Sequence, residues 1–256
     1  MAIGNWSLCW PFGFKETKMK RVIIIGASSG IGKELAKLYA KEGNLVGITG
    51  RRNDLLLQMK ETFPANILTS CFDVTGNDCR KHLEQLISDM GGLDLLIYNA
   101  GIGDPSIELI DEVEMITTQT NVVGFVALVT YAFNYFTKKG AGQIALTSSI
   151  AALRGNSWTP AYSASKAFMS NYAEGLSIKA YRLKNEIAIT DIKPGFIQTK
   201  MAKGNGQFWV ASPKKASRQI KDAIDKKKRV VYITHRWWLV AQALKFLPFC
   251  FYKRIA

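Results

Sequence analysis

The sequence predicts an α/β fold, a doubly wound parallel sheet of about seven strands with helices on both faces. Three observations predict it. Short apolar runs alternate with segments of helical periodicity along most of the 256 residues, each run is apolar at nearly every position, and the first run closes on a cluster of glycines. Strands that are apolar on both faces are typical of parallel sheets covered by helices on both sides.

The amino-terminal half supplies four of the strands. RVIIIG, residues 21–26, is a β-branched run closed by glycine, which is typical of a buried strand. KELAKLYAKEG, residues 33–43, has apolar residues at helical spacing and ends on a glycine suited to a helix C-cap. The same alternation continues, and we expect strands at 45–49, 66–72 and 93–99 and helices at 53–61 and 77–90.

The carboxyl-terminal half supplies three more strands and the longest helices. We expect helices at about 111–138, 161–184 and 213–227 and strands at 143–149, 186–192 and 229–234. Right-handed crossovers between such units give a Rossmann-type sheet that binds ligands at the carboxyl ends of its strands. Without an internal repeat or a low-complexity linker, the chain is interpreted as one domain over 21–234. An extension precedes it at 1–20, and a basic, aromatic segment follows at 235–256.

Composition narrows the classes of protein that fit. The hydrophobic content of 48% is typical of a globular chain, and no window reaches the roughly 20 uninterrupted apolar residues of a membrane-spanning helix. The four cysteines form no C-x-x-C pair and the two histidines lie far apart, so we expect neither a disulfide framework nor a metal site. A reducing, cytoplasmic location follows as the expectation.

The net charge of +14 is concentrated at the two ends of the chain. Residues 23–202 hold 17 basic and 17 acidic side chains, whereas residues 203–256 hold 13 basic and 2 acidic ones. Nucleic-acid binders and proteins on anionic membranes can both carry such an excess. Because no recognition motif accompanies the charge, we expect no nucleic-acid partner.

The first expected strand ends in GASSGIG, residues 26–32. Glycines at 26, 30 and 32 allow a tight turn and let backbone N–H groups approach a pyrophosphate at the start of the next helix. The spacing differs from the G-x-G-x-x-G of the common dinucleotide fingerprint, and a tight strand-to-helix turn alone also needs glycine. Within this strand–helix alternation, the turn favours a nucleotide site.

The second expected strand ends in TGRR, residues 49–52. An NAD site uses an acidic residue near here for the ribose 2′-hydroxyl, whereas this chain has Arg51 and Arg52. A guanidinium matches a 2′-phosphate, so NADP(H) is favoured over NAD(H). The alternative is that both arginines are simply solvated.

These motifs and those that follow resemble the short-chain dehydrogenase/reductase superfamily in its compact single-domain form. NAG at 99–101, then Asn121, Ser149, Tyr162, Lys166 and PG at 194–195 stand in the family's order between about Arg21 and Thr199. One small departure is Ile25, where the family usually has threonine.

Tyr162 and Lys166 are spaced to lie on one face of a helix. An isolated phenol titrates near ~10, too high for a proton shuttle at neutral pH. We expect a nearby ammonium and a positive nicotinamide ring to favour the phenolate and lower that pKa. The resemblance implies that Tyr162 is the general acid/base and that Lys166 binds the nicotinamide ribose. It further implies that Ser149 holds the substrate carbonyl and that Asn121 binds a water linking Lys166 to solvent.

The resemblance also implies which residues contact the cofactor. Asp73 and Val74 would contact the adenine, and Asn99, Ala100 and Gly101 would back its ribose. The segment after the last glycine pair would hold the nicotinamide carboxamide. The complete expected cofactor set is Gly26, Ser28, Ser29, Gly30, Ile31, Gly32, Arg51, Arg52, Asp73, Val74, Asn99, Ala100, Gly101, Tyr162, Lys166, Pro194, Gly195, Ile197 and Thr199.

The end of the chain is unusually aromatic. Residues 237–252 are nearly all apolar, interrupted by Gln242 and Lys245 and broken at Pro248, with basic residues on both sides. We expect an interfacial segment on the cytoplasmic face of an anionic membrane. The alternative is a helix that covers a substrate pocket or packs in an oligomer interface.

We also expect a loop at about 196–213 to give the active site an apolar lining from Met201, Phe208, Trp209 and Val210.

Together these features predict an NADP(H)-dependent oxidoreductase acting on a small hydrophobic carbonyl or alcohol. The alternative is a cofactor-binding sensor or scaffold without turnover, which would not need all four of Asn121, Ser149, Tyr162 and Lys166. The resemblance implies a homodimer or homotetramer formed through the two long helices.

Overall fold

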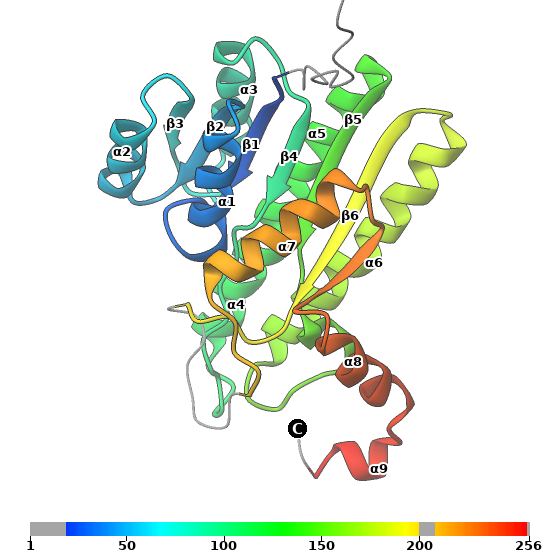
Figure 1. Ribbon diagram of the computed structural model, residues 1–256. Helices are drawn as coiled ribbons and strands as arrows, with labels where there is room; N and C mark the ends of the chain where they lie inside the picture. The colour runs from blue at the N-terminus through cyan, green and yellow to red at the C-terminus, as the bar shows by residue number, and fades with distance from the viewer. Residues whose placement is uncertain (1–18, 200–207, 255–256) are drawn as a thin grey trace, which may run out of the picture.

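The computed structural model describes residues 19–199 and 208–254. A parallel sheet of seven strands forms its centre, in the order β3-β2-β1-β4-β5-β6-β7 (Figure 1). The strands are β1 (Arg21–Ile25), β2 (Leu45–Gly50), β3 (Ile67–Cys71), β4 (Leu95–Tyr98), β5 (Ala141–Thr147), β6 (Glu186–Pro194) and β7 (Val230–Ile233).

Helices cover both faces of this sheet. The principal ones are α1 (Gly30–Lys41), α2 (Asn53–Thr62), α3 (Cys79–Asp89), α4 (Asp111–Thr118), α5 (Gly124–Lys139), α6 (Pro160–Arg182) and α7 (Pro213–Asp225). Helices α3, α5 and α6 share one apolar core with the sheet, and α1, α2 and α7 share the other. The predicted doubly wound fold is therefore confirmed.

Strand β1 shows why the sequence produces two cores. Val22 and Ile24 enter the core under α1, α2 and α7, whereas Ile23 and Ile25 enter the core on the opposite face. Successive side chains of a strand point to opposite faces, so a strand covered on both sides must be apolar throughout.

The order of the strands creates a crevice at their carboxyl ends. Strand β1 pairs with β2 on one side and with β4 on the other, so the connections after β1 and after β4 lead away from each other. In a doubly wound sheet this divergence is the topological switch point, where ligands bind. The glycine-rich turn follows β1, and Asn99 follows β4.

Three differences from the predicted elements bear on the site, and most other element ends shift by one to three residues. The helix predicted at 111–138 consists of α4 and α5 joined by a π-helical turn, η1 (Gln119–Val123). Strand β5 ends at Thr147, so Ser149 is the N-cap of a short 3₁₀ helix, η2 (Ile150–Leu153). Strand β6 continues to Pro194, beyond the predicted end at 192. Apolar periodicity cannot detect an extra residue in a helical turn, because the flanking turns keep the helical period.

The stretch Asp111–Lys139 is, within the described residues, long and apolar enough to cross a membrane by length and composition. Half of its most apolar window is buried inside the domain. Phe125, Leu128 and Phe136 of α5 lie fully buried in the core under the sheet. The apolar character of this stretch is thus explained by its place as a core helix.

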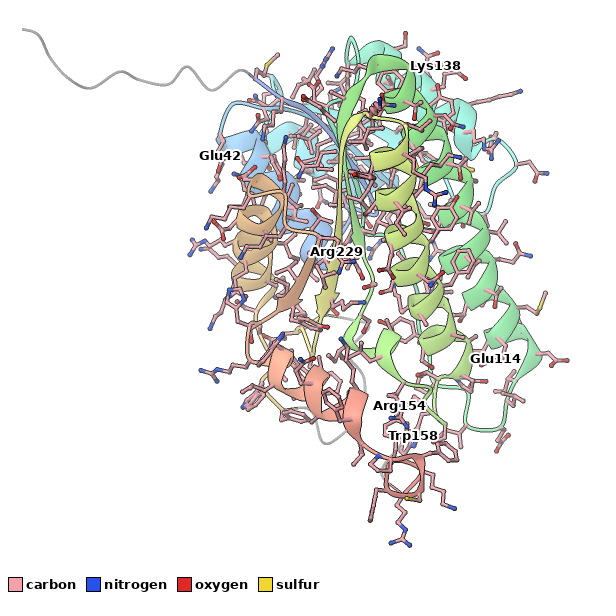
Figure 2. The ribbon with its side chains drawn as sticks, turned by 90° about the vertical axis from the view of Figure 1, so that its right-hand side faces the viewer. Glu42, Glu114, Lys138, Arg154, Trp158 and Arg229 are labelled. Atoms are coloured by element: carbon pink, nitrogen blue, oxygen red, sulfur yellow. The ribbon has the colours of Figure 1, made fainter. Side chains whose placement is uncertain are left out.

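The carboxyl-terminal segment forms two short helices, α8 (Trp237–Phe246) and α9 (Phe249–Tyr252), separated at Leu247–Pro248. The segment is attached to the domain through Arg154, which donates hydrogen bonds to Leu244 O at 2.9 Å and Leu247 O at 2.8 Å. The Arg154 guanidinium also lies 4.3 Å from the centre of the Tyr252 ring. Figure 2 shows Arg154 and Trp158 beside these helices, at the end of the molecule where the strands terminate.

Candidate active site

The glycine-rich turn between β1 and α1 has no room for larger residues. Gly26 has φ +84°, and a Cβ there would lie 2.7 Å from the Ala100 backbone. A Cβ on Gly32 would overlap Gly26 O. Gly30 has φ +59° and faces Thr199, whose Cγ2 would lie 3.2 Å from an added Cβ. The turn is therefore a backbone cradle at the amino end of α1, as a pyrophosphate site requires.

Asn99 joins this cradle to the centre of the sheet. Its Nδ2 donates to Gly26 O at 2.9 Å, and its Oδ1 accepts from Thr147 Oγ1 at 3.3 Å. Gly101 follows in the same turn, where a Cβ would meet Lys166 Nζ at 3.1 Å and Asn121 Oδ1 at 3.2 Å. The predicted NAG turn thus touches both the cradle and the predicted catalytic side chains.

The two arginines after β2 have different environments. Arg52 Nη2 donates to Ser28 Oγ at 2.7 Å and Ser29 Oγ at 2.8 Å, so its guanidinium lies over the cradle. Arg51 Nη1 lies 3.5 Å from Asp73 Oδ2. Asp73 also accepts two hydrogen bonds from Thr75. Arg52 is therefore the better placed of the two for a phosphate that rests on the cradle.

The predicted catalytic side chains come together at the carboxyl ends of β4 and β5. The Ser149 side chain lies close enough to the Tyr162 hydroxyl to influence its pKa. Lys166 is buried, and its Nζ donates to Thr147 O at 2.8 Å and lies 5.7 Å from the centre of the Tyr162 ring. Ser149 Oγ also accepts from Ala151 N at 3.1 Å, which fixes its side chain as the cap of η2.

Without a bound cofactor, the pKa of Tyr162 is raised. Burial raises it, and the nearby Ser149 hydroxyl lowers it by less. The pKa of Lys166 is lowered to about 8 by burial, which the charge of Asp191 opposes. The protein groups by themselves therefore keep Tyr162 protonated at neutral pH, because the loss of hydration outweighs the influence of Ser149.

Asn121 lies in the π-helical turn η1 and is fully buried. Its side chain pairs with the backbone of Ile102, accepting from N at 2.9 Å and donating to O at 2.8 Å. It also donates to Ser165 Oγ at 3.0 Å. These contacts hold the turn after β4 against α6, while its Oδ1 remains close to the Gly101 position that Lys166 also faces.

The segment after β6 closes the other side of the site. Gly195 N donates to Ile233 O at 2.6 Å, and Ile197 pairs with Ala211 in an isolated bridge. A Cβ on Gly195 would overlap the Trp237 indole ring. Trp237 in turn stacks on Phe208, with ring centres 5.0 Å apart. Of the four loop side chains predicted to line the active site, Met201 lies outside the described residues.

The other two predicted loop residues, Trp209 and Val210, remain partly exposed, as does Phe208. Phe208 and Trp209 pack edge to face on each other and join Phe196 and Trp237 in one aromatic cluster. This cluster connects the loop to α8.

Four predicted cofactor residues have a mainly structural environment. Ile31 is buried in the core under α1, and Pro194 ends strand β6. Val74 is buried, and its carbonyl oxygen would lie 2.6 Å from a Cβ on Gly124. The Asp73 carboxylate pairs with Arg51 and accepts a hydrogen bond from Thr75.

The sequence analysis missed Gly103 and Trp237 as parts of the site. A Cβ on Gly103 would overlap the Tyr162 ring, so the absence of a side chain there makes room for the phenol. The signal was the sequence NAGIG at 99–103, in which a second glycine follows the first after one residue. Trp237 carried no signal, because nothing in the sequence places the carboxyl-terminal segment against Gly195.

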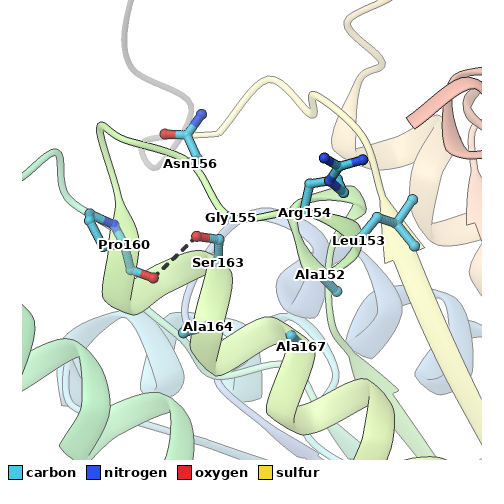
Figure 3. Close-up of a pocket in the computed structure, with 9 residues that line it drawn as sticks. All are labelled: Ala152, Leu153, Arg154, Gly155, Asn156, Pro160, Ser163, Ala164 and Ala167. Carbon is cyan, nitrogen blue, oxygen red and sulfur yellow. Dashed lines mark hydrogen bonds between the residues drawn. The ribbon is translucent and has the colours of Figure 1, made fainter. Parts of the chain in front are cut away.

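A cavity of about 290 Å³ lies between the 152–156 segment and the start of α6 (Figure 3). Ser163 in its wall donates to Pro160 O at 3.1 Å. By helical spacing, Ser163 and Ala167 face a different side of α6 from Tyr162 and Lys166. The cavity therefore borders a different side of α6 from the one that carries Tyr162 and Lys166. Within residues 19–199 and 208–254, no group of three or more His, Cys, Asp or Glu side chains gathers that could hold a metal ion.

Comparison with known proteins agrees with this geometry. A family model described as short chain dehydrogenase matches residues 20–208. An 11-beta-hydroxysteroid dehydrogenase A from Sesamum indicum is 33% identical over 218 residues, which cover 79% of this chain and 59% of that protein. The chain thus spans less than two thirds of that relative's length. An uncharacterized oxidoreductase of Mycobacterium tuberculosis is 30% identical over 191 residues, covering 71% of this chain and 75% of that one.

Solved structures share the fold at lower identity. A short-chain dehydrogenase from Streptomyces avermitilis superposes with a TM-score of 0.77 at 22% identity and covers 89% of this chain and 92% of its own. The protein ElxO with NADP bound gives a TM-score of 0.75 at 22% identity, covering 86% of this chain and 99% of its own.

Gly103→Ala tests the close approach of the turn to the Tyr162 ring. We expect the added methyl group to lower the free energy of unfolding by about 1–3 kcal/mol, because it overpacks a filled site. Urea denaturation measures the loss. Gly155→Ala is the matched control, since no atom lies within 4 Å of its added Cβ, and it should leave the midpoint unchanged or slightly raised. Equal effects of the two variants would contradict the geometry.

Proposed function

Because the chain belongs to the short-chain dehydrogenase family, whose members are oxidoreductases of alcohols and carbonyls, we propose that it transfers a hydride between NADP(H) and a lipophilic carbonyl or alcohol, with Tyr162 as general acid/base. The observation that carries the proposal is the meeting of Ser149, Tyr162 and Lys166 beside a backbone cradle built by glycines. The nicotinamide, when bound, supplies or accepts the hydride.

The side chains of the chain then manage the proton. The hydroxyl groups of Ser149 and Tyr162 lie near each other, so a substrate oxygen placed between them would accept from both. A raised pKa keeps Tyr162 protonated at neutral pH, which is the state that donates a proton when a carbonyl is reduced. Lys166, with a pKa of about 8, remains mostly an ammonium at pH 7 and stabilises the phenolate that forms.

Arg52 supports NADP(H) as the cofactor. Its guanidinium is held by Ser28 and Ser29 on the cradle, and the described structure gives it no carboxylate partner. A 2′-phosphate would supply that negative charge, and Arg–phosphate pairs are strong because they are charge-assisted and can be bidentate. Arg51 contributes less, since Asp73 already pairs with it.

A lipophilic substrate is supported by two observations. Phe196, Phe208, Trp209 and Trp237 form an aromatic cluster next to Gly195, in the segment that follows β6. Several curated relatives carry the name 11-beta-hydroxysteroid dehydrogenase, which describes a large apolar alcohol. We therefore propose a hydrophobic substrate, with steroids as the first compounds to try.

The carboxyl-terminal helices support contact with a membrane surface. Phe246, Phe249 and Phe251 are 82%, 71% and 58% exposed, and Lys245 and Lys253 stand among them. Exposed aromatic side chains next to basic ones are typical of interfacial segments on anionic lipid. We propose that the protein is cytoplasmic and binds peripherally through α8 and α9, which would bring it close to lipophilic substrates.

Self-association through the long helices is also proposed. Helix α6 exposes Phe168 and Ile178, and the α4–η1 stretch exposes Met115, Ile116 and Val123. Apolar side chains of this size on two neighbouring helices favour a homodimer or a homotetramer.

Tyr162→Phe tests the proton transfer. We expect turnover to fall by about 10²- to 10⁴-fold while NADPH still binds, because the variant loses only the hydroxyl. The assay supplies NADPH with 11-ketosteroids and with a total lipid extract in vesicles, and mass spectrometry detects products with two added hydrogens. Tyr181→Phe, on the exposed side of the same helix, is the control and should retain full turnover. NADPH binding by the wild type without any turnover would favour the sensor alternative.

Arg52→Ala tests the choice of cofactor. We expect the dissociation constant of NADPH to rise about 10- to 100-fold, because a charge-assisted contact is lost, while that of NADH changes little. Isothermal titration of both cofactors measures the difference. Arg51→Ala should have a smaller effect on NADPH, since it is paired with Asp73. An equal loss for NADPH and NADH in Arg52→Ala would reject a 2′-phosphate contact.

Replacing Phe246, Phe249 and Phe251 together by serine tests membrane contact. We expect binding to vesicles that contain phosphatidylserine to weaken by about 100-fold or more, because three exposed aromatic rings are lost. Cosedimentation measures binding, and pure phosphatidylcholine vesicles and high salt should both weaken wild-type binding. Tyr181→Ser, an exposed aromatic on α6, is the control. If the wild type binds vesicles with and without phosphatidylserine equally weakly, membrane contact is rejected, and α8 and α9 only cover the end of the domain.

A further inference from the structure

Behind the predicted catalytic residues, strand β6 carries a buried ion pair that has no direct role in the proposed proton transfer. Asp191 is 4% exposed and Lys193 is 6% exposed, and Lys193 Nζ lies 2.7 Å from Asp191 Oδ2. The two residues are separated by one position, so both side chains point to the same face of the sheet. That face is the one packed against α6.

The Asp191 carboxylate accepts from three different parts of the chain. Its Oδ1 accepts from Ser148 Oγ, just after β5. Its Oδ2 accepts from Ser170 Oγ of α6 at 2.8 Å and from Lys193 of its own strand. Ile192 O lies 3.1 Å from Ser148 Oγ and shares the single proton of that hydroxyl with Asp191, and Lys193 donates to Ser170 Oγ. The cluster is therefore fully hydrogen-bonded, as a buried charge requires.

Each serine in this cluster is next to a catalytic candidate. Ser148 directly precedes Ser149, so the hydrogen bond to Asp191 fixes the backbone from which the Ser149 hydroxyl projects. Ser170 stands one helical turn after Lys166 and two turns after Tyr162. One carboxylate thus ties together the end of β5 and helix α6, which carry the two halves of the site.

Stability alone gives little reason for this arrangement. The cost of removing two charges from water is large, and apolar residues of similar volume often give equal or greater stability at such positions. A buried, fully paired group has instead one preferred geometry, which makes it suited to holding neighbouring elements in register.

We propose that Asp191 is a positioning residue, which holds Ser149 and the Tyr162–Lys166 face of α6 at their working separation and sets the charge environment of Lys166. This inference rests on the proposed function, since it assigns Asp191 a part in the same proton transfer. It does not place Asp191 in contact with substrate or cofactor.

The charges around Lys166 predict the direction in which its pKa should shift when the ion pair is changed. Within the described structure, the titratable groups around Lys166 are Tyr162 on its own helix and the Asp191–Lys193 pair on β6. The neighbouring η1 and the turn after β4 contribute Asn121 and Gly101, which do not titrate. Asp191 raises the pKa of Lys166 against the lowering by burial.

The two single variants of the pair should therefore act in opposite directions. Asp191→Asn leaves the Lys193 charge uncompensated, so the Lys166 ammonium becomes less stable and loses its proton at lower pH. Lys193→Met leaves the carboxylate uncompensated, so Lys166 keeps its proton to higher pH. The double variant restores neutrality and should return close to the wild-type value, about 8.

The experiment follows the Lys166 titration by NMR of protein labelled with ¹³C at the lysine Cε, with Lys166→Arg used to assign the signal. We expect midpoint shifts of about one pH unit, downward for Asp191→Asn and upward for Lys193→Met. Shifts of one sign in both variants, or no shift in either, would overturn the electrostatic part. If Asp191→Asn does not fold, the direction of the Lys166 shift in Lys193→Met still tests the electrostatic part.

Kinetics test the positioning part. Ser148→Ala removes the link from β5 to Asp191, and we expect kcat to fall about tenfold with KM nearly unchanged, because substrate binding is preserved while the donor geometry is loosened. The alkaline limb of the pH–rate profile should stay in place for Ser148→Ala and move to lower pH for Asp191→Asn. Ser163→Ala, which removes only hydrogen bonds within α6, is the control and should leave kcat unchanged. Equal kcat values for Ser148→Ala and the wild type would overturn positioning by Asp191.

The two arms also separate this inference from the proposed function. The NMR titration needs no turnover, so it decides on Asp191 even if no substrate is reduced. Conversely, loss of turnover in Tyr162→Phe together with an unmoved Lys166 titration would keep the oxidoreductase and reject the role of Asp191.

Discussion

The close approach of the turn after β1 to the turn after β4 is the constraint on which the rest of the site depends. At Gly26 an added Cβ would lie 2.7 Å from the backbone of Ala100, so the two turns are in direct contact. The hydrogen bond from Asn99 to Gly26 O closes the same junction. A sheet buried on both faces fixes these strands side by side, and the absence of a side chain then allows their turns to meet.

From this junction, hydrogen bonds extend to the predicted catalytic groups without interruption. Asn99 accepts from Thr147, and the Thr147 carbonyl accepts from Lys166. Asn121 holds the turn after β4 against α6 through Ile102 and Ser165. The cradle and the lysine are thus parts of one polar network, in which each position depends on its neighbours.

The carboxyl-terminal segment has two sides with different physical character. Trp237 and Ala241 are buried against the domain, and Arg154 binds the last carbonyl groups of α8. Phe246, Phe249 and Phe251 remain exposed on the outer side. The segment therefore covers the end of the domain on one side and presents an apolar, basic surface on the other. One helix can do both, because its residues face different directions at helical spacing.

The sequence by itself determined the seven strands and the helices between them, because apolar runs, helical periodicity and glycine spacing are local properties of the chain. The candidate site residues came from the family resemblance. It also placed Ser149, Tyr162 and Lys166 at one edge of the sheet. The sequence did not reveal the π-helical turn at Asn121, the contact of Trp237 with Gly195, or the link from Asp191 to Ser148 and Ser170. It also did not reveal that burial raises the pKa of Tyr162 when no cofactor is bound. These properties depend on residues far apart in the chain and on the water that packing removes, which only the tertiary structure decides.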